Sequence, residues 1–156
     1  MKNNWSEKDA KQFIRKYTSK GYTEDMAYRV YTTQLLGNNP KLVLHGGGNT
    51  SVKTEARDLD SKKYEVLCVK GSGWDMGDIE PEGLPAVKLK PMLSMINKKR
   101  LSDHDMVSFQ KRNLLDTKSP NPSVETFLHA FLPHKFVDHT HADAILDITT
   151  CPPSLA

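Results

Sequence analysis

The chain has no apolar run that approaches the length of a membrane span, and its first residues lack the apolar core of a secretory signal peptide. Cysteine is also scarce: the chain has only Cys68 and Cys151, which stand far apart in the sequence. Two distant cysteines fit a reducing compartment better than a disulfide framework. We therefore expect a cytoplasmic location and no membrane partner.

The chain has little charge of one sign. Lys and Arg number 22 against 19 Asp and Glu, which gives a formal net charge of +3, and the longest basic run, Lys98-Lys99-Arg100, is typical of a solvated helix end. We therefore expect no nucleic-acid partner. The 156 residues are 37% hydrophobic and 26% charged, without repeats or low-complexity tracts, which indicates one globular domain with a substantial core.

Helical spacing of apolar residues predicts two helices near the start of the chain. The first begins after Ser6, a candidate cap, and the second follows Thr23 and stops at Gly37. Their apolar stripes carry no obvious chemical group, so we expect both helices to contribute to the core. Further helices are predicted over residues 91–99, 102–113 and 142–148.

Between residues 41 and 70 the pattern changes from helical to extended. Residues 41–45, 50–54 and 64–70 are predicted to form antiparallel strands joined by short connections. Two glycine-rich loops, Gly46-Gly47-Gly48 and Gly71-Ser72-Gly73, lie at the ends of these strands. Glycines allow backbone geometries closed to other residues, and consecutive N–H groups there can converge on an anion. Two such loops together favour a phosphate or sugar-hydroxyl pocket.

The stretch from Asn121 to Ala144 carries the strongest functional pattern, an acid at the head of a helix followed by two histidines. Apolar residues four apart predict a helix that starts near Ser123 and stops at Pro133. Glu125 then lies in the first turn, where the positive end of the helix dipole stabilises a carboxylate. The simpler alternative is that Glu125 only caps the helix.

Residues 135–141 are predicted to form the strand that follows this helix. Since successive side chains of a strand point to opposite faces, His139 and His141 would share one face, which makes half of a metal site. Such a pair can also be surface or hydrogen-bonded core histidines. His129 is four residues after Glu125, within reach of its carboxylate. Apart from that contact, we expect the remaining histidines to be structural or surface groups: His45, His104, His129 and His134.

Four motifs in this order resemble the class II aldolase/adducin family. They are Gly48-Asn49-Thr50-Ser51, Ser72-Gly73, Pro122-Ser123-Val124-Glu125 and His139-Thr140-His141, and the resemblance covers about residues 25–150. Residues 125–145, ETFLHAFLPHKFVDHTHADAI, are most similar to the aldolase half of bifunctional rhamnulose-1-phosphate aldolase/short-chain dehydrogenase proteins. The resemblance implies an α/β fold of three layers, αβα, with a largely antiparallel central sheet.

The same resemblance implies a zinc-dependent aldolase that cleaves a sugar phosphate, similar to rhamnulose 1-phosphate, by a retro-aldol reaction and forms homo-oligomers. Glu125 would be the catalytic acid–base group, and His139 and His141 would be zinc ligands. Two alternatives use the same fold: a sugar-phosphate epimerase or dehydratase, and a non-catalytic interaction module like the adducin head. The implied substrate- and phosphate-binding residues are Gly48, Asn49, Ser72, Gly73 and Ser123.

The chain departs from the family pattern in two places. Val124 stands where phosphate-binding members often have a second serine, which removes one hydroxyl donor. The family's third zinc histidine lies well downstream of the histidine pair, whereas this sequence ends at Ala156. We therefore expect residues 1–156 to be the N-terminal part of a single class II aldolase-like domain, truncated at its C-terminus. We also expect the third ligand beyond residue 156, and no activity in the fragment.

Overall fold

The computed structural model describes residues 3–151, which form six α-helices, one short 3-10 helix and four strands. The helices are α1 (Glu7–Thr18), α2 (Glu24–Gly37), α3 (Leu89–Leu93), α4 (Asp103–Arg112), α5 (Thr126–Phe131) and α6 (Asp143–Thr150), with the 3-10 helix η1 at Pro81–Gly83. The strands are β1 (Asn49–Arg57), β2 (Lys63–Val69), β3 (Ala86–Lys88) and β4 (Phe136–His139).

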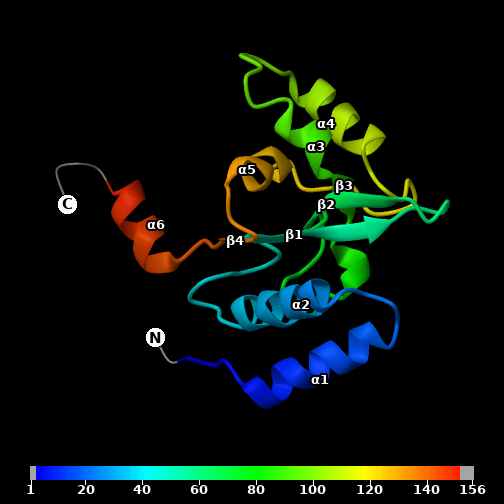
Figure 1. Ribbon diagram of the computed structural model, residues 1–156. Coiled ribbons are helices and arrows are strands. Elements are labelled where there is room, and N and C mark those ends of the chain that lie inside the picture. Colours follow the sequence, from blue (N-terminus) through cyan, green and yellow to red (C-terminus); the bar gives the residue numbers. More distant parts are fainter. Residues whose placement is uncertain (1–2, 152–156) are drawn as a thin grey trace.

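The four strands form one sheet in the order β3-β2-β1-β4, and every neighbouring pair is antiparallel. Helices α1 and α2 lie on one face of the sheet, and α3, α4 and α5 lie on the other (Figure 1). The predicted three-layer αβα fold with an antiparallel central sheet is therefore confirmed. Strand β1 pairs with β2 on one side and with β4, which carries His139, on the other.

Local sequence signals explain where three of the helices begin. The side-chain oxygen of Ser6 accepts a hydrogen bond from the backbone of Asp9, and the Thr23 hydroxyl does the same for Met26. Ser102 caps α4 in the same way. These caps satisfy backbone N–H groups that have no partner inside the helix, so the helices start where the sequence predicts.

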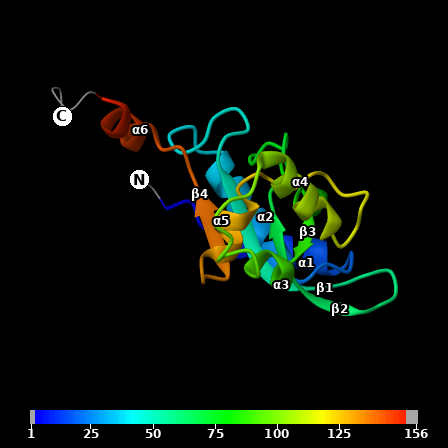
Figure 2. The same cartoon turned by 90° about the horizontal axis from the view of Figure 1, so that it is seen from above.

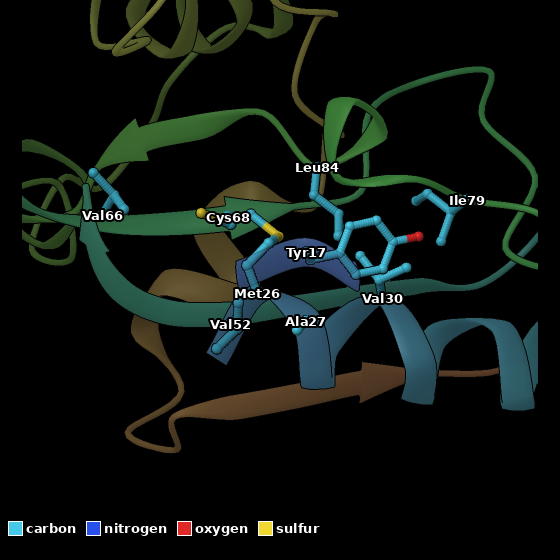
Figure 3. Packing of buried hydrophobic residues seen from close by; sticks show 9 residues of the cluster. All are labelled: Tyr17, Met26, Ala27, Val30, Val52, Val66, Cys68, Ile79 and Leu84. Carbon is cyan, nitrogen blue, oxygen red and sulfur yellow. The ribbon is translucent and has the colours of Figure 1, made fainter. Parts of the chain in front are cut away.

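The core has two parts, one on each face of the sheet. On one face, apolar side chains of α2 pack against β1 and β2, with Tyr17 of α1 completing the layer (Figure 3). Cys68 lies in this layer, and burial raises the pKa of its thiol to about 12, so it behaves as an apolar core residue. On the other face, the smaller cluster consists of Leu67, Val69, Val87, Met92, Leu114 and Ala130.

The elements predicted over residues 41–45 and 91–99 are wrong in type or length. Residues 41–45 form turns instead of a strand, because Val43 bonds back to the carbonyl of Asn39 and His45 adopts a left-handed backbone with φ of 48°. Helix α3 is shorter than the predicted 91–99 helix. It ends at Leu93, and Ile96, expected on the apolar side, is 56% exposed.

The end of the described chain is poorly covered. Strand β4 lies at the edge of the sheet and pairs with β1 alone among the described strands. Helix α6 follows β4 and stands away from the body of the molecule in two perpendicular views (Figures 1 and 2). None of its residues is buried, and Ile145 and Ile148 are 59% and 68% exposed. Within residues 3–151, no helix has the length and apolar character that crossing a membrane requires.

Candidate active site

Strand β1 contacts helix α5 through three polar side chains that alternate along the strand and therefore face the same side. Asn49 Nδ2 donates a hydrogen bond to Glu125 Oε2 at 3.1 Å, and Ser51 Oγ lies 2.8 Å from His129 Nδ1. Lys53 Nζ donates to one carbonyl in the last turn of α5, that of residue 129, and to two just after the helix, those of residues 132 and 134, at 3.0, 2.6 and 2.7 Å. We call these contacts the β1–α5 ladder. They fix the position of Glu125 relative to the sheet.

Glu125 is the N-cap residue of α5, one position before the predicted first turn, because its ψ of 3° lies outside the helix. Its backbone N–H donates to Ser123 Oγ at 3.2 Å, so the serine positions the residue that precedes the helix. Helix α5 has six residues, and a helix this short provides a weaker dipole than predicted. The hydrogen bonds to the carboxylate are therefore its main stabilisation.

The carboxylate of Glu125 also contacts His139, whose Nδ1 lies 3.1 Å from Oε2. Burial raises the pKa of Glu125, but the hydrogen bonds from His139 and Asn49 outweigh burial and hold the pKa below its ordinary value. The group is therefore ionised at neutral pH. Because an ionised carboxylate only accepts hydrogen bonds, Nδ1 of His139 carries the proton and Nε2 is the nitrogen that remains for a metal.

The two histidines of the predicted pair lie side by side, although not on one continuous strand. Strand β4 ends at His139, and the backbone N–H of His141 bonds to the carbonyl of Leu42 at 2.8 Å, which corrects the predicted strand over residues 135–141. The ring centroids of His139 and His141 are 4.8 Å apart, with 61° between the ring planes. Both imidazoles are therefore within reach of one small ligand.

The second glycine-rich loop contacts the segment that precedes α5, and Lys70 links it to the first loop. Gly71 forms an isolated antiparallel bridge with Pro122, and Lys70 Nζ donates to the carbonyl of Gly46 at 3.1 Å. The backbone N–H of Ser72 is committed to the carbonyl of Asn121 at 3.0 Å, so its hydroxyl and not its N–H is available to a ligand. Ser72 and Gly73 are exposed, whereas Ser123 is buried.

Gly48 occupies a position that no other residue fits without rearrangement. Its φ is +69°, and a Cβ there would lie 2.8 Å from the carbonyl oxygen of His139 and 3.1 Å from the Met76 sulfur. The first glycine loop also touches the second histidine, since a Cβ on Gly47 would lie 3.2 Å from His141 Nδ1. The loop therefore packs directly against both histidines.

The sequence prediction missed Lys70. This side chain is 5% exposed, and burial lowers its pKa, against the opposing effects of Asp75 and Glu125. A lysine at the end of a predicted buried strand, next to Gly-Ser-Gly, was the available signal. Lys70 adds a cation beside the first glycine loop.

His129 contacts Ser51 rather than the predicted Glu125 carboxylate. Burial lowers the pKa of His129 to about 4, with Glu125 acting in the opposite direction, so the ring is neutral near pH 7. It is completely buried, and its Nε2 has no hydrogen-bond partner among the described residues.

The residues present fit part of a zinc centre. Neutral imidazoles are good zinc ligands, and the His139–Glu125 contact is the arrangement in which a carboxylate orients a metal-binding histidine. No group of three His, Cys, Asp or Glu side chains in residues 3–151 is arranged to hold a metal ion. A complete site would therefore need a further ligand from outside these residues.

One sizeable cavity among the described residues lies away from this site. Its volume is about 720 Å³, and it is lined by the loop between α1 and α2, the far ends of β1 and β2, and residues 116 to 120. It includes none of the site residues. Residues that line this cavity already pair with one another in structural contacts, such as Tyr22 with Glu82. The polar groups that converge near Glu125 are therefore the better candidate for an active site.

The fold and this site define a three-layer α/β domain that brings a carboxylate, two imidazoles and two glycine loops together. Residues 29–154 match the family described as the Class II Aldolase and Adducin N-terminal domain, and the chain belongs to this family.

A curated relative from Bacillus subtilis (strain 168), the "Uncharacterized oxidoreductase YuxG", is 42% identical over 119 residues, which are 76% of this chain and 17% of that protein. A solved structure, the N-terminal class II aldolase domain of a conserved protein from Thermoplasma acidophilum, has a TM-score of 0.83 and 42% identity, covering 99% of this chain and 67% of that one. The chain thus spans less than a fifth of the curated relative's length.

Proposed function

We propose that this chain is part of a zinc-dependent aldehyde-lyase that cleaves a sugar phosphate, similar to rhamnulose 1-phosphate, by a retro-aldol reaction. The observation that carries the proposal is the position of Glu125. One carboxylate oxygen accepts hydrogen bonds from Asn49 and His139, and the His141 ring lies beside that of His139. An acid–base group next to two metal-binding side chains is what this reaction needs.

His139 and His141 would hold the zinc ion, with a third ligand from the part of the domain beyond residue 156. Zinc, when bound, supplies the positive charge that stabilises negative charge on the oxygens beside the breaking carbon–carbon bond. Glu125 orients His139 through Nδ1, which leaves Nε2 directed to its ligand.

Glu125 would move the proton at the reacting carbon. In the condensation direction, the carboxylate removes a proton from the carbon beside the carbonyl; in cleavage, it returns that proton to the same carbon. The hydrogen bonds that hold the pKa of Glu125 below its ordinary value keep the carboxylate ionised, which is the form that accepts a proton. Asn49 holds the carboxylate in place through the hydrogen bond to Oε2.

The glycine loops would bind the phosphate and hydroxyl groups of the substrate. The proposed binding residues are Gly48, Asn49, Ser72, Gly73 and Ser123. The bridge of Gly71 with Pro122 and the hydrogen bond of Lys70 to Gly46 support this pocket, and the buried cation of Lys70 adds attraction for an anion. The Ser123 hydroxyl accepts from Glu125 N, so its own proton remains to donate.

We also propose that further chain follows in the parent protein and completes the domain. The uncovered edge of β4 and the exposed apolar residues of α6 support this proposal, as does the longer chain of the similar solved structure. The oxidoreductase name of the curated relative supports a dehydrogenase segment in the parent. A cytoplasmic location and a homo-oligomer remain part of the proposal.

The test is an assay of the purified full-length parent with candidate sugar phosphates, with and without zinc, in which the products are identified by mass and NMR. We expect a ketotriose phosphate and an aldehyde in equal amounts. An epimer or a dehydrated sugar as the sole product would assign the alternative chemistry to this site. Absence of zinc binding and of turnover would favour the adducin-head-like module.

A further inference from the structure

Arg29 in α2 is completely enclosed by the protein, with 1% of its surface exposed, and its guanidinium contacts three consecutive residues of β4. Nη2 forms an ion pair with Asp138 at 2.7 Å, and Nη1 donates to the carbonyl of Val137 at 3.4 Å. The guanidinium carbon lies 5.5 Å from the centre of the Phe136 ring. These residues immediately precede His139.

The same guanidinium also contacts β1, at a position that matters for the pairing of the two strands. Nη1 donates to the carbonyl of Ser51 at 3.1 Å, and Ser51 is the partner of Val137 in the β1–β4 register. One nitrogen of Arg29 therefore bridges the two carbonyls of a single register pair. Two positions further along the same register, Asn49 pairs with His139.

The Asn49–His139 pair is the one that determines the geometry around Glu125, because both side chains donate to the same carboxylate oxygen. A slip of β4 by one residue would move His139 to the other face of the sheet. The contact of His139 with Glu125 would then be lost, while Asn49 would remain on β1.

Apolar burial does little to prevent such a slip. Strand β4 has four residues and lies at the sheet edge, and Val137 is its only buried residue. A short edge strand with one buried side chain has a weakly specified register. Burying an arginine is also unfavourable unless its contacts offset the loss of hydration, and a well-packed apolar side chain is often at least as stable at such a site.

We propose that Arg29 is a positioning residue that sets the register of β4 on β1 and thereby places the His139 imidazole against Glu125. This inference rests on the proposed role of His139 as a metal ligand. Arg29 touches neither His139 nor Glu125, so it acts through the strand.

The experiment uses the full-length parent protein and compares Arg29→Met with Lys16→Met. The control variant breaks the Lys16–Glu80 ion pair, which has an N–O distance of 2.9 Å and lies in the same helical layer away from β4. Hydrogen–deuterium exchange, measured by mass spectrometry on zinc-free protein, reports the β4 peptide separately from the β2 peptide. Zinc affinity is measured in parallel by competition with a chelating dye.

We expect exchange of the β4 peptide to be about tenfold faster or more in Arg29→Met, with exchange of β2, which does not pair with β4, unchanged, and zinc affinity about 10- to 100-fold weaker. Lys16→Met should change neither readout. Asp138→Asn, which removes the ion pair and keeps the carbonyl bridge, should have a smaller effect than Arg29→Met.

Unchanged exchange in β4 would overturn the inference, as would an effect of Asp138→Asn as large as that of Arg29→Met. If Arg29→Met does not fold, Arg29→Lys provides the same test, since it keeps the charge but loses the planar fork; normal β4 exchange and zinc affinity in that variant would also overturn it. Failure of the wild-type protein to bind zinc would count against the proposed function, while the exchange data on zinc-free protein would still test the role of Arg29.

Discussion

The chemistry proposed for this site depends on one oxygen atom. Glu125 Oε2 accepts hydrogen bonds from Asn49 and His139, both at 3.1 Å. Asn49 lies on the inner strand β1 and His139 on the edge strand β4. The carboxylate of Glu125 therefore contacts both strands through one oxygen. Replacing this carboxylate tests the catalytic role with little change in shape.

In the full-length enzyme, Glu125→Gln should lower turnover by about two to four orders of magnitude, the usual contribution of a positioned acid–base group. The amide has nearly the same volume but does not accept a proton at neutral pH. Zinc content and substrate binding should stay nearly intact, because the amide oxygen can still accept the hydrogen bonds from Asn49 and His139. Steady-state kinetics and metal analysis of the purified variant are the measurements.

Glu24→Gln, in the exposed first turn of α2, is the matched control and should leave turnover unchanged. Near-normal turnover of Glu125→Gln would remove Glu125 from the mechanism. A large loss of stability instead would support the simpler view that Glu125 only caps α5.

His129 should make the domain less stable in acid. Its pKa is about 4 in the fold and 6.5 when unperturbed, because burial disfavours the charged ring. Between these pH values the unfolded chain binds more protons, so the free energy of unfolding rises with pH and the stability is lost as pH falls from 6.5 towards 4. The difference between the two pKa values corresponds to about 3 kcal/mol in the free energy of unfolding.

Urea denaturation of the protein at several pH values between 4 and 7 measures this effect, with His129→Gln as the test variant. The variant should have a flatter pH dependence, whereas His104→Gln, at an exposed residue, should keep the wild-type slope. Equal slopes in His129→Gln and wild type would show that another group causes the acid sensitivity.

At the scale of an element, the glycine before β1 controls how closely the first loop approaches β4. Gly48→Ala should be destabilising by about 1–2 kcal/mol from its left-handed backbone, and further because its Cβ would lie 2.8 Å from the His139 carbonyl oxygen. Gly21→Ala is a matched control, since Gly21 has φ of +88° with open space around it.

Urea denaturation and zinc binding of both variants separate the cost of the left-handed backbone from the cost of the close contact with the His139 carbonyl. Gly21→Ala should show the backbone strain alone and bind zinc as wild type does. Gly48→Ala should be clearly less stable than Gly21→Ala and bind zinc more weakly. Equal stability of the two variants would mean that the loop can move away from β4 without a loss in the free energy of unfolding.

The elements that could be predicted from the sequence are those with local signals. Ser6, Thr23 and Ser102 cap their helices as predicted, and the antiparallel β1–β2 hairpin forms close to the predicted ranges. In each case the decisive contacts are close in the sequence, so hydrogen-bonding preference and apolar spacing are sufficient.

The parts that could not be predicted depend on contacts between distant residues. Residues 41–45 have a strand-like composition, but only Val43 is buried and the segment turns. The pairing of Ser51 with His129, the bridge from Arg29 to β4, and the proximity of Lys70 to Gly46 have no local signal. The family motifs indicated which residues belong to the site, but not which partners hold them.

At the scale of the whole molecule, the 156-residue chain alone should bind zinc weakly and show no aldol cleavage. Two imidazoles without the third ligand should lose several kcal/mol of binding free energy, since a complete structural site provides on the order of 10–16. Equilibrium dialysis against zinc beside a cleavage assay is the measurement. Tight stoichiometric zinc together with cleavage would contradict the prediction and indicate a third ligand within the chain, from His45, His104, His129 or His134.

The same chain should self-associate. The edge of β4 that no other described strand covers and the exposed apolar residues of α6, including Ile145, Leu146 and Ile148, are surfaces that pair readily with another copy. Sedimentation velocity over a range of concentrations should show reversible oligomers. A variant with Ile145→Lys and Ile148→Lys should shift the distribution towards monomer, and an unchanged distribution would place the contact elsewhere.

The β1–α5 ladder has a consequence that follows from spacing alone. Two residues of a strand advance about 6.6 Å and four residues of a helix about 6 Å, so the two periods nearly coincide. Asn49 and Ser51 therefore meet Glu125 and His129 together. Moving α5 by one residue would shift it by about 1.5 Å and rotate it by about 100°, which would break every contact of the ladder at once. Helix α5 can thus dock on β1 in one position only, and the site should form in a single cooperative step with no partly docked state.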